Sequence, residues 1–167
     1  DIVALINQGN KGDVPATIGD LEQKRTAIKR LLEQSQGCMD GVVALGDKNF
    51  PKHRGDVKNS EQPIFLFYKG DLSLLSLTNR NVAVIGLLNP TPEIEGRERQ
   101  VVAELVKQGA TIVSGLALGC DSIAHRTTLE CNGKTVAILP SPLSSIMPAT
   151  NRPLAQQILD QGGLLVS

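Results

Sequence analysis

The stretch Asn81-Val82-Ala83-Val84-Ile85-Gly86 decides the fold of this chain. It lacks polar alternation, and its β-branched content predicts a strand buried on both faces, as in a parallel sheet. Thr91 and Pro92 then favour a helix start, with Thr91 as the N-cap and Pro92 at the first helical position. The segment Thr111-Ile112-Val113-Ser114 predicts the returning strand. Residues 81–115 therefore indicate a right-handed βαβ unit, which places the chain in the α/β class.

Two turns follow the strands of this unit, and ligands of parallel sheets bind outside the carboxyl ends of the strands. The segments to consider are 86–90 and 114–121. The second contains two glycines and leads into a helix that should run to about Cys131, with Asp121 or Ser122 as its cap. Such a helix start favours phosphate, because free N–H groups and the helix dipole both attract anions. Neither segment matches the dinucleotide fingerprint or the P-loop.

The remaining chain adds further strands and helices. Thr17 and Asp20 form a capping-box pattern that predicts a helix to about Ser35. Helices are also expected at 72–77 and 151–161, and strands at 42–45, 64–68, 134–139 and 164–167.

Composition excludes several classes of protein. The chain has 167 residues, 41% apolar and 20% charged, which suits one ordinary globular domain. Its net charge is zero, so the chain lacks the overall excess of positive charge that is typical of a duplex-DNA binder. It contains no membrane-length apolar run and no leader, and its three cysteines lack metal-ligand spacing. We therefore expect a cytoplasmic protein without a metal site, and no cofactor motif is recognisable.

Chemistry could reside in a small group of side chains. Asp121 and His125 lie four residues apart on one helix, so they could form an acid–base pair with Ser114 or Cys120 as nucleophile. A helix N-terminus could also lower the pKa of Cys120. A capping Asp and a packed His are the commoner roles, so catalysis is not expected. Basic residues flank aromatic ones through 50–69, a pattern compatible with strand binding or with a solvated loop beside a buried strand.

The order of several segments resembles the DprA/Smf family (DNA-processing protein A). The matching segments are 66–72, 81–86, 111–119, Asp121 with Ala124-His125, 133–139, and Pro148 with Asn151. The resemblance implies an extended Rossmann-like, three-layer fold with a mainly parallel sheet and helices on both faces. It places the family domain at 41–167, with the C-terminal part of that domain missing, and the residue pattern before it indicates an N-terminal helical segment at 1–40.

The resemblance further implies single-stranded DNA binding in DNA processing, natural transformation and recombination. RecA would be a partner, a homodimer is expected, and no enzymatic turnover or cofactor is implied. The positions expected to bind DNA or a nucleotide are Lys69, Gly86, Asn89, Ser114, Gly115, Gly119, Asp121, Lys134, Ser141 and Asn151.

Departures from the family pattern fall on the expected binding edge. Gly86-Leu87-Leu88 replaces the family's Gly-Ser-Arg, so a phosphate-binding cation is missing. Residues 140–144, Pro-Ser-Pro-Leu-Ser, replace a turn that usually carries two glycines, Cys120 replaces the usual Ile, and Met147 replaces a common aromatic residue. One lost charge-assisted contact is worth about 1.5–3 kcal/mol, so we expect weakened or altered DNA binding.

Three other functions stay open. The chain could be a nucleotide-ligand binding or sensing domain of the same Rossmann-like group. It could be an enzyme like the related nucleotide phosphoribohydrolases, although their Gly-Gly-x-Gly-Thr-x-x-Glu loop is absent from the sequence. It could also be a degenerate domain that retains only an oligomeric contact.

Overall fold

The structure is a computed structural model that describes residues 2–10, 12, 14–35, 37–52, 55, 57–58 and 61–167. It divides into two compact units, residues 1–37 and residues 38–167. His53 and Arg54, in the basic stretch considered above, lie outside the described residues. In the described part of the chain, no helix is both long and apolar enough to cross a membrane.

The first unit contains the helices α1 (Ile2–Gly9) and α2 (Ile18–Gln34). The capping box predicted at the start of α2 is confirmed. The Thr17 hydroxyl accepts a hydrogen bond from the Asp20 N–H at 3.2 Å, and the Asp20 carboxylate accepts one from the Thr17 N–H at 2.9 Å. These bonds satisfy two groups at the helix start that would otherwise lack partners.

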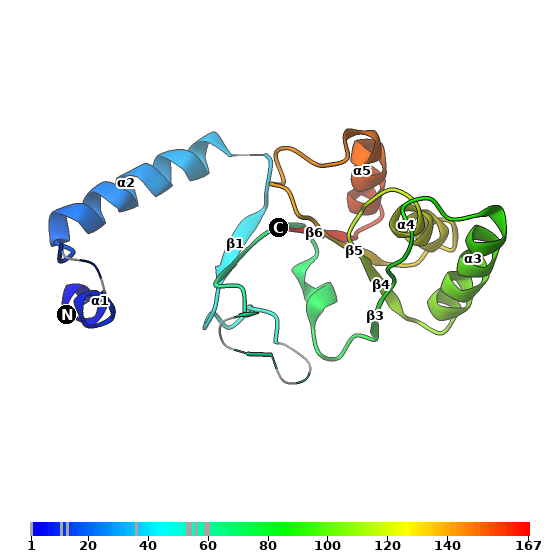
Figure 1. The fold of residues 1–167 in the computed structure, drawn as a ribbon, viewed down its shortest axis with the longest axis horizontal. Helices are drawn as coiled ribbons and strands as arrows, with labels where there is room; N and C mark the ends of the chain where they lie inside the picture. Colours follow the sequence, from blue (N-terminus) through cyan, green and yellow to red (C-terminus); the bar gives the residue numbers. More distant parts are fainter. Residues whose placement is uncertain are drawn as a thin grey trace. The chain divides into compact units, whose positions relative to one another are not determined.

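The second unit is built on a mixed six-stranded sheet with the order β1-β2-β6-β5-β4-β3 (Figure 1). Strands β3, β4, β5 and β6 are parallel, β2 runs antiparallel to β6, and β1 runs antiparallel to β2. The α/β class and the mainly parallel sheet are thereby confirmed. The elements in chain order are β1 (Gly41–Ala44), β2 (Phe65–Gly70), the 3-10 helix η2 (Leu72–Leu75), β3 (Asn81–Ala83), α3 (Pro92–Lys107), β4 (Thr111–Ser114), α4 (Cys120–Glu130), β5 (Thr135–Ile138), the 3-10 helix η3 (Ala149–Asn151), α5 (Arg152–Asp160) and β6 (Leu164–Val166).

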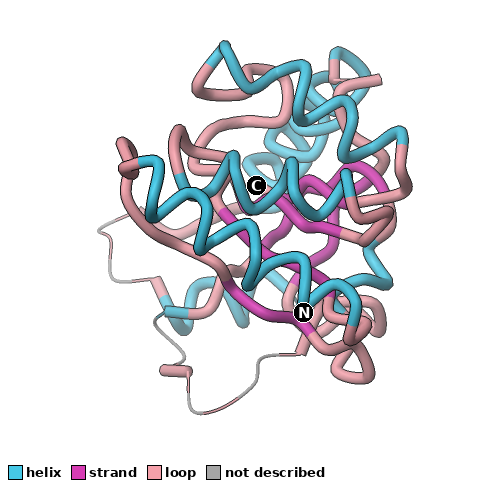
Figure 2. Tube along the Cα trace, turned by 90° about the vertical axis from the view of Figure 1, so that its right-hand side faces the viewer, coloured by secondary structure: helices cyan, strands magenta, loops and turns pink. Residues whose placement is uncertain are grey.

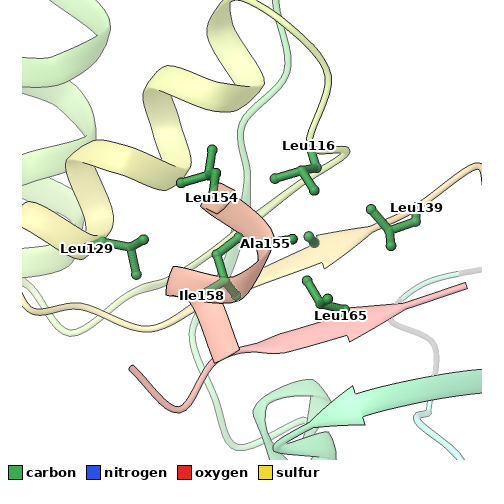
Figure 3. Packing of buried hydrophobic residues seen from close by; sticks show 8 residues of the cluster. Leu116, Leu129, Leu139, Leu154, Ala155, Ile158 and Leu165 are labelled. Atoms are coloured by element: carbon green, nitrogen blue, oxygen red, sulfur yellow. The ribbon is translucent and has the colours of Figure 1, made fainter. Parts of the chain in front are cut away.

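Helices α3, α4 and α5 pack on one face of the sheet. Ile158 of α5 belongs to a buried cluster with Leu165 of β6 (Figure 3), and Val102 of α3 packs with Ile112 of β4. The other face is covered in part by η2, whose Leu74 packs with Val136 of β5 and with Leu164 and Val166 of β6. Figure 2 shows the strands running through the middle of this unit. The sequence predicts helices on both faces, and the structure has α-helices on one face and, among the described residues of this unit, the 3-10 helix η2 on the other.

The central strand differs from the prediction in length and burial. β3 ends at Ala83 and lies at an edge of the sheet, where it pairs with β4 alone. Ala83 is exposed, and the Ile85 side chain is 82% exposed. The predicted burial on both faces is therefore wrong here, because an edge strand has one neighbour and α3 covers one face of it.

Candidate functional site

A cavity of about 330 Å³ lies at the carboxyl ends of the parallel strands. The loops that follow β3 and β4 form two of its walls, and α3, α4 and η3 complete it. We call it the carboxyl-edge cavity, and its polar lining residues are Asn89, Glu95, Ser122, Arg126 and Asn151. This is the edge that the sequence predicts for a ligand.

The two loops contact one another at Gly119, where only glycine fits. Gly119 has φ +71°, and a Cβ there would lie 2.2 Å from the Leu87 carbonyl oxygen and 2.4 Å from that of Leu88. The next residue, Cys120, donates its N–H to the same Leu87 oxygen at 3.0 Å. Gly119 is the N-cap of α4, so the prediction of Asp121 or Ser122 as the cap is wrong.

Asp121 instead holds the turn that precedes α4. Its carboxylate accepts hydrogen bonds from the N–H groups of Gly115 at 3.1 Å and Ala117 at 3.2 Å. Ser122 contributes as well, since its hydroxyl donates to the Ala117 carbonyl oxygen at 2.5 Å. These bonds fix the backbone that leads to the cavity.

Asn151 connects the cavity wall to a distant part of the chain. It is 1% exposed, and its amide nitrogen lies 2.9 Å from the Leu116 oxygen, 3.2 Å from the Ala117 oxygen and 2.9 Å from the Ser122 hydroxyl. Ser114 acts similarly at the other loop, donating its hydroxyl to the Val84 carbonyl oxygen at 2.7 Å. The expected residues Ser114 and Asn151 therefore position the loops.

Arg126 is the cation of the cavity, and sequence reasoning did not find it. It is exposed, lies one turn after Ser122 on α4, and makes no ion pair with any described residue. The i, i+4 spacing from Ser122 could have indicated it, because such residues share one helix face. The acidic Glu95 also lines the cavity, but its carboxylate is paired with Arg99 at 3.0 Å.

Of the other expected positions, Gly86 and Asn89 lie near the cavity, and Ser141 does not line it. Gly86 lies against the start of α4, since a Cβ there would come 2.7 Å from the Cys120 sulfur. Asn89 lines the cavity. Ser141 belongs to the loop after β5 and accepts a hydrogen bond from the Met147 N–H at 3.2 Å, without lining the cavity.

Lys134 and Lys69 are not brought to this cavity. Lys134 immediately precedes β5, at the amino ends of the parallel strands, and its ammonium donates to the Gln161 carbonyl oxygen. Lys69 of β2 pairs with Leu165 of β6, and Gly70 pairs with Leu164, the first residue of β6. Lys69 therefore lies near the amino end of β6, away from the carboxyl ends of the parallel strands. The expectation that both lysines support the same binding edge is wrong, because β2 and the start of β5 place them on other parts of the sheet.

The candidate acid–base pair is not arranged for catalysis. His125 is fully buried, and its Nδ1 lies 2.7 Å from the Thr135 hydroxyl, whose own proton goes to the Ile112 oxygen at 2.8 Å. Nδ1 is therefore the protonated nitrogen. Burial lowers the pKa of His125 to about 4, while the nearby Asp121 raises it less.

Cys120 also differs from the expectation of a lowered pKa. The neighbouring Glu98 carboxylate raises the pKa of Cys120, with burial as the second cause and the contact to the Leu87 backbone as a smaller opposing one. The thiol is therefore favoured over the thiolate, which is the nucleophilic form. Among the described residues, no group of three His, Cys, Asp or Glu side chains could hold a metal ion.

Comparisons with known proteins identify a family and relatives that are similar to this chain in sequence. Residues 41–167 match the family model of DNA recombination-mediator protein A. The chain is 32% identical over 126 residues to Protein Smf of Borreliella burgdorferi, covering 75% of this chain and 39% of that protein. It is 27% identical over 139 residues to the DNA processing protein DprA of Bacillus subtilis, covering 83% of this chain and 46% of that one. The chain thus spans less than half the length of these relatives.

Solved structures show the same likeness. The X-ray structure of DNA processing protein A from Streptococcus pneumoniae superposes with a TM-score of 0.74 at 26% identity, covering 99% of this chain and 55% of that one. A structure of DNA processing protein A from Helicobacter pylori, which describes its single-stranded DNA binding mode, gives a TM-score of 0.61 at 34% identity, covering 76% of this chain and 54% of that one. The match of the family model to residues 41–167 covers most of the chain, which therefore belongs to the DNA recombination-mediator protein A family.

Proposed function

We propose that this chain binds single-stranded DNA at the carboxyl-edge cavity, in DNA processing, natural transformation and recombination. The observation that carries the proposal is Arg126 of α4, a cation without an ion pair to any described residue, in the cavity that the turns after β3 and β4 line. Membership of the family and the DNA-binding relative from Helicobacter pylori support the choice of ligand.

The chemistry of the cavity suits one phosphate. Arg126 offers a guanidinium, which binds phosphate with two parallel hydrogen bonds. The first turn of α4 adds the positive end of the helix dipole, and Asn89 adds an amide. Arg126 would thus replace, from α4, the cation that the loop after β3 lacks at Leu88.

A salt titration tests this proposal. Labelled oligo-dT is titrated with the chain, and fluorescence anisotropy gives the affinity at several salt concentrations. With one or two phosphates held, the logarithm of the affinity should fall against the logarithm of salt with a slope of roughly −0.7 to −1.4. Arg126→Ala should weaken binding about 10-fold or more, the value of one charge-assisted contact.

Arg97→Ala is the matched control, because Arg97 is an exposed arginine of α3 paired with Glu93 at 2.6 Å. It removes the same charge from outside the cavity, and its affinity should stay within about 2-fold of the wild type, as expected for an exposed pair. Equal losses in the two variants would mean that net charge, rather than the cavity, attracts the strand. Absence of binding at low salt would refute the proposal.

A free nucleotide-derived ligand is the second candidate. The cavity volume of about 330 Å³ favours it, because this lies in the range of small-molecule sites. Competition of thymidine monophosphate against labelled oligo-dT separates the two ligands. Displacement at similar concentrations would favour the small ligand, whereas much tighter binding of the strand would favour DNA.

We also propose, by family analogy, that the protein acts in the cytoplasm as a homodimer that delivers DNA to RecA without enzymatic turnover. The relatives named above are more than twice as long as the segment matched here, so these properties are proposed for the whole protein. Sedimentation of this chain tests the dimer, and a pull-down with RecA tests the contact.

A further inference from the structure

A second cavity lies on the opposite side of the sheet from α3, α4 and α5. It encloses about 600 Å³ between the loop 48–52, Tyr68 of β2, and the segment 72–77 that contains η2. Tyr68 belongs to the cluster of Leu74 on the η2 face, which fixes the side of the sheet. We call this cavity the lysine groove, and it shares no lining residue with the carboxyl-edge cavity.

The charged side chains among the described lining residues of the lysine groove are both lysines. Lys48 and Lys52 line it, both are exposed, and neither forms an ion pair with a described residue. No acidic side chain is among its described lining residues. The nearby Asp47 carboxylate is engaged by the Ala44 N–H at 2.8 Å. Two lysines without a carboxylate partner among the described residues attract an anion, and lysine is a common phosphate ligand.

The rest of the groove lining includes an aromatic ring and aliphatic side chains. Tyr68, Leu72 and Leu75 line the groove, pack against the cluster of Leu74 and are half-buried. The ring is held against β1, since a Cβ on Gly41 would lie 2.8 Å from the phenol oxygen. A fixed aromatic ring beside aliphatic side chains offers a surface on which a nucleobase can stack.

We propose that the lysine groove is a second nucleotide site, separate from the carboxyl-edge cavity. Lys48 and Lys52 hold the phosphate of a nucleoside monophosphate unit, and its base lies on Tyr68. The groove volume of about 600 Å³ suits a ligand the size of a nucleoside monophosphate. This unit is either part of a bound DNA strand or a free nucleotide. The first case rests on the proposed function, and the second does not.

The composition of the chain supplies a direct measurement. Tyr68 is its single tyrosine and it has no tryptophan, so intrinsic tyrosine emission reports on this groove alone. Thymidine monophosphate and unlabelled oligo-dT are titrated separately into the full chain. We expect a saturable fall in Tyr68 emission, because a stacked base quenches the emission of the ring. Thymidine, which lacks the phosphate, should bind more weakly than thymidine monophosphate.

Two double variants locate the phosphate contact. Lys48→Ala with Lys52→Ala should raise the dissociation constant about 10-fold or more, because two charge-assisted contacts are lost. Lys58→Ala with Lys107→Ala is the matched control, since both lysines are exposed, carry the same charge and make only exposed ion pairs outside the groove. Its dissociation constant should be unchanged within about 2-fold.

The outcomes separate the two proposals. Arg126→Ala should leave the effect of thymidine monophosphate on Tyr68 intact, even if it abolishes strand binding at the other cavity. A response to oligo-dT alone would identify the strand as the source of the nucleotide, and a response to thymidine monophosphate alone would identify a free nucleotide. No change in Tyr68 emission with either ligand, equal loss in both double variants, or equal binding of thymidine would overturn the lysine groove as a nucleotide site.

Discussion

Gly119 has a conformation and a position that a side chain would disrupt. Its φ of +71° is unfavourable for residues with a Cβ, and the added atom would meet two carbonyl oxygens at 2.2 and 2.4 Å. We expect Gly119→Ala to lower the free energy of unfolding by about 2–4 kcal/mol, from backbone strain and overpacking together. Urea denaturation measures it.

Gly96 is the matched control for this substitution. It lies inside α3, it is exposed, and a Cβ there would meet no atom within 4 Å. Gly96→Ala should therefore stabilise the chain by roughly 0.5–1 kcal/mol. Similar effects of the two substitutions would contradict the close approach of the loops at Gly119.

His125 should make stability depend on pH. Its pKa falls from 6.5 to about 4 on folding, so the unfolded chain binds more protons between these values. The contribution of neutral His125 to the free energy of unfolding is present in full above pH 6.5 and is lost as the pH falls toward 4. The change is about 3 kcal/mol, at 1.36 kcal/mol per pH unit. An NMR titration of the ring should give a midpoint near 4, whereas a midpoint near 6.5 would show that the ring is not buried.

At the scale of elements, η3 and α4 depend on the amide of Asn151. Asn151→Ala leaves the buried carbonyl groups of Leu116 and Ala117 without this donor, which should cost about 1–3 kcal/mol. Asn151→Asp should cost more, because a carboxylate would face two carbonyl oxygens. Urea midpoints rank the two variants, and Asn89→Ala, which changes an exposed cavity residue, should leave the midpoint near that of the wild type.

Local patterns predicted most of the helices and strands, although not α1, because the causes of these elements are local. Thr17 with Asp20, and Thr91 with Pro92, begin helices where the sequence predicts them. Sheet order depends on contacts between distant residues, so the edge position of β3 and the exposure of Ile85 were not predictable from an apolar run.

The candidate site shows the same limit. Its turns were predictable, because glycines and strand ends mark them. Arg126 was not found, because its i, i+4 spacing from Ser122, which places both residues on one face of α4, was not used. Lys134 was assigned to the wrong edge because its position relative to β5 was not used: a residue before a strand lies at the opposite end from the turn that follows it.

At the scale of the whole molecule, residues 38–167 should behave as an independent folding unit. The sheet and its three buried clusters all lie within these residues, whereas α2 contains no buried residue. Deletion of residues 1–37 should leave one cooperative unfolding transition with a midpoint close to that of the full chain. Loss of the cooperative transition would show that the first unit is required for the fold.

The central claim is that the chain binds single-stranded DNA at the carboxyl ends of its parallel strands. The most direct measurement compares the affinity of Arg126→Ala and Lys134→Ala for labelled oligo-dT at one low salt concentration. Each variant removes one positive charge, from opposite ends of the strands. The account predicts about a 10-fold or greater loss for Arg126→Ala and little change for Lys134→Ala. A larger loss for Lys134→Ala would place the strand at the opposite edge and contradict it.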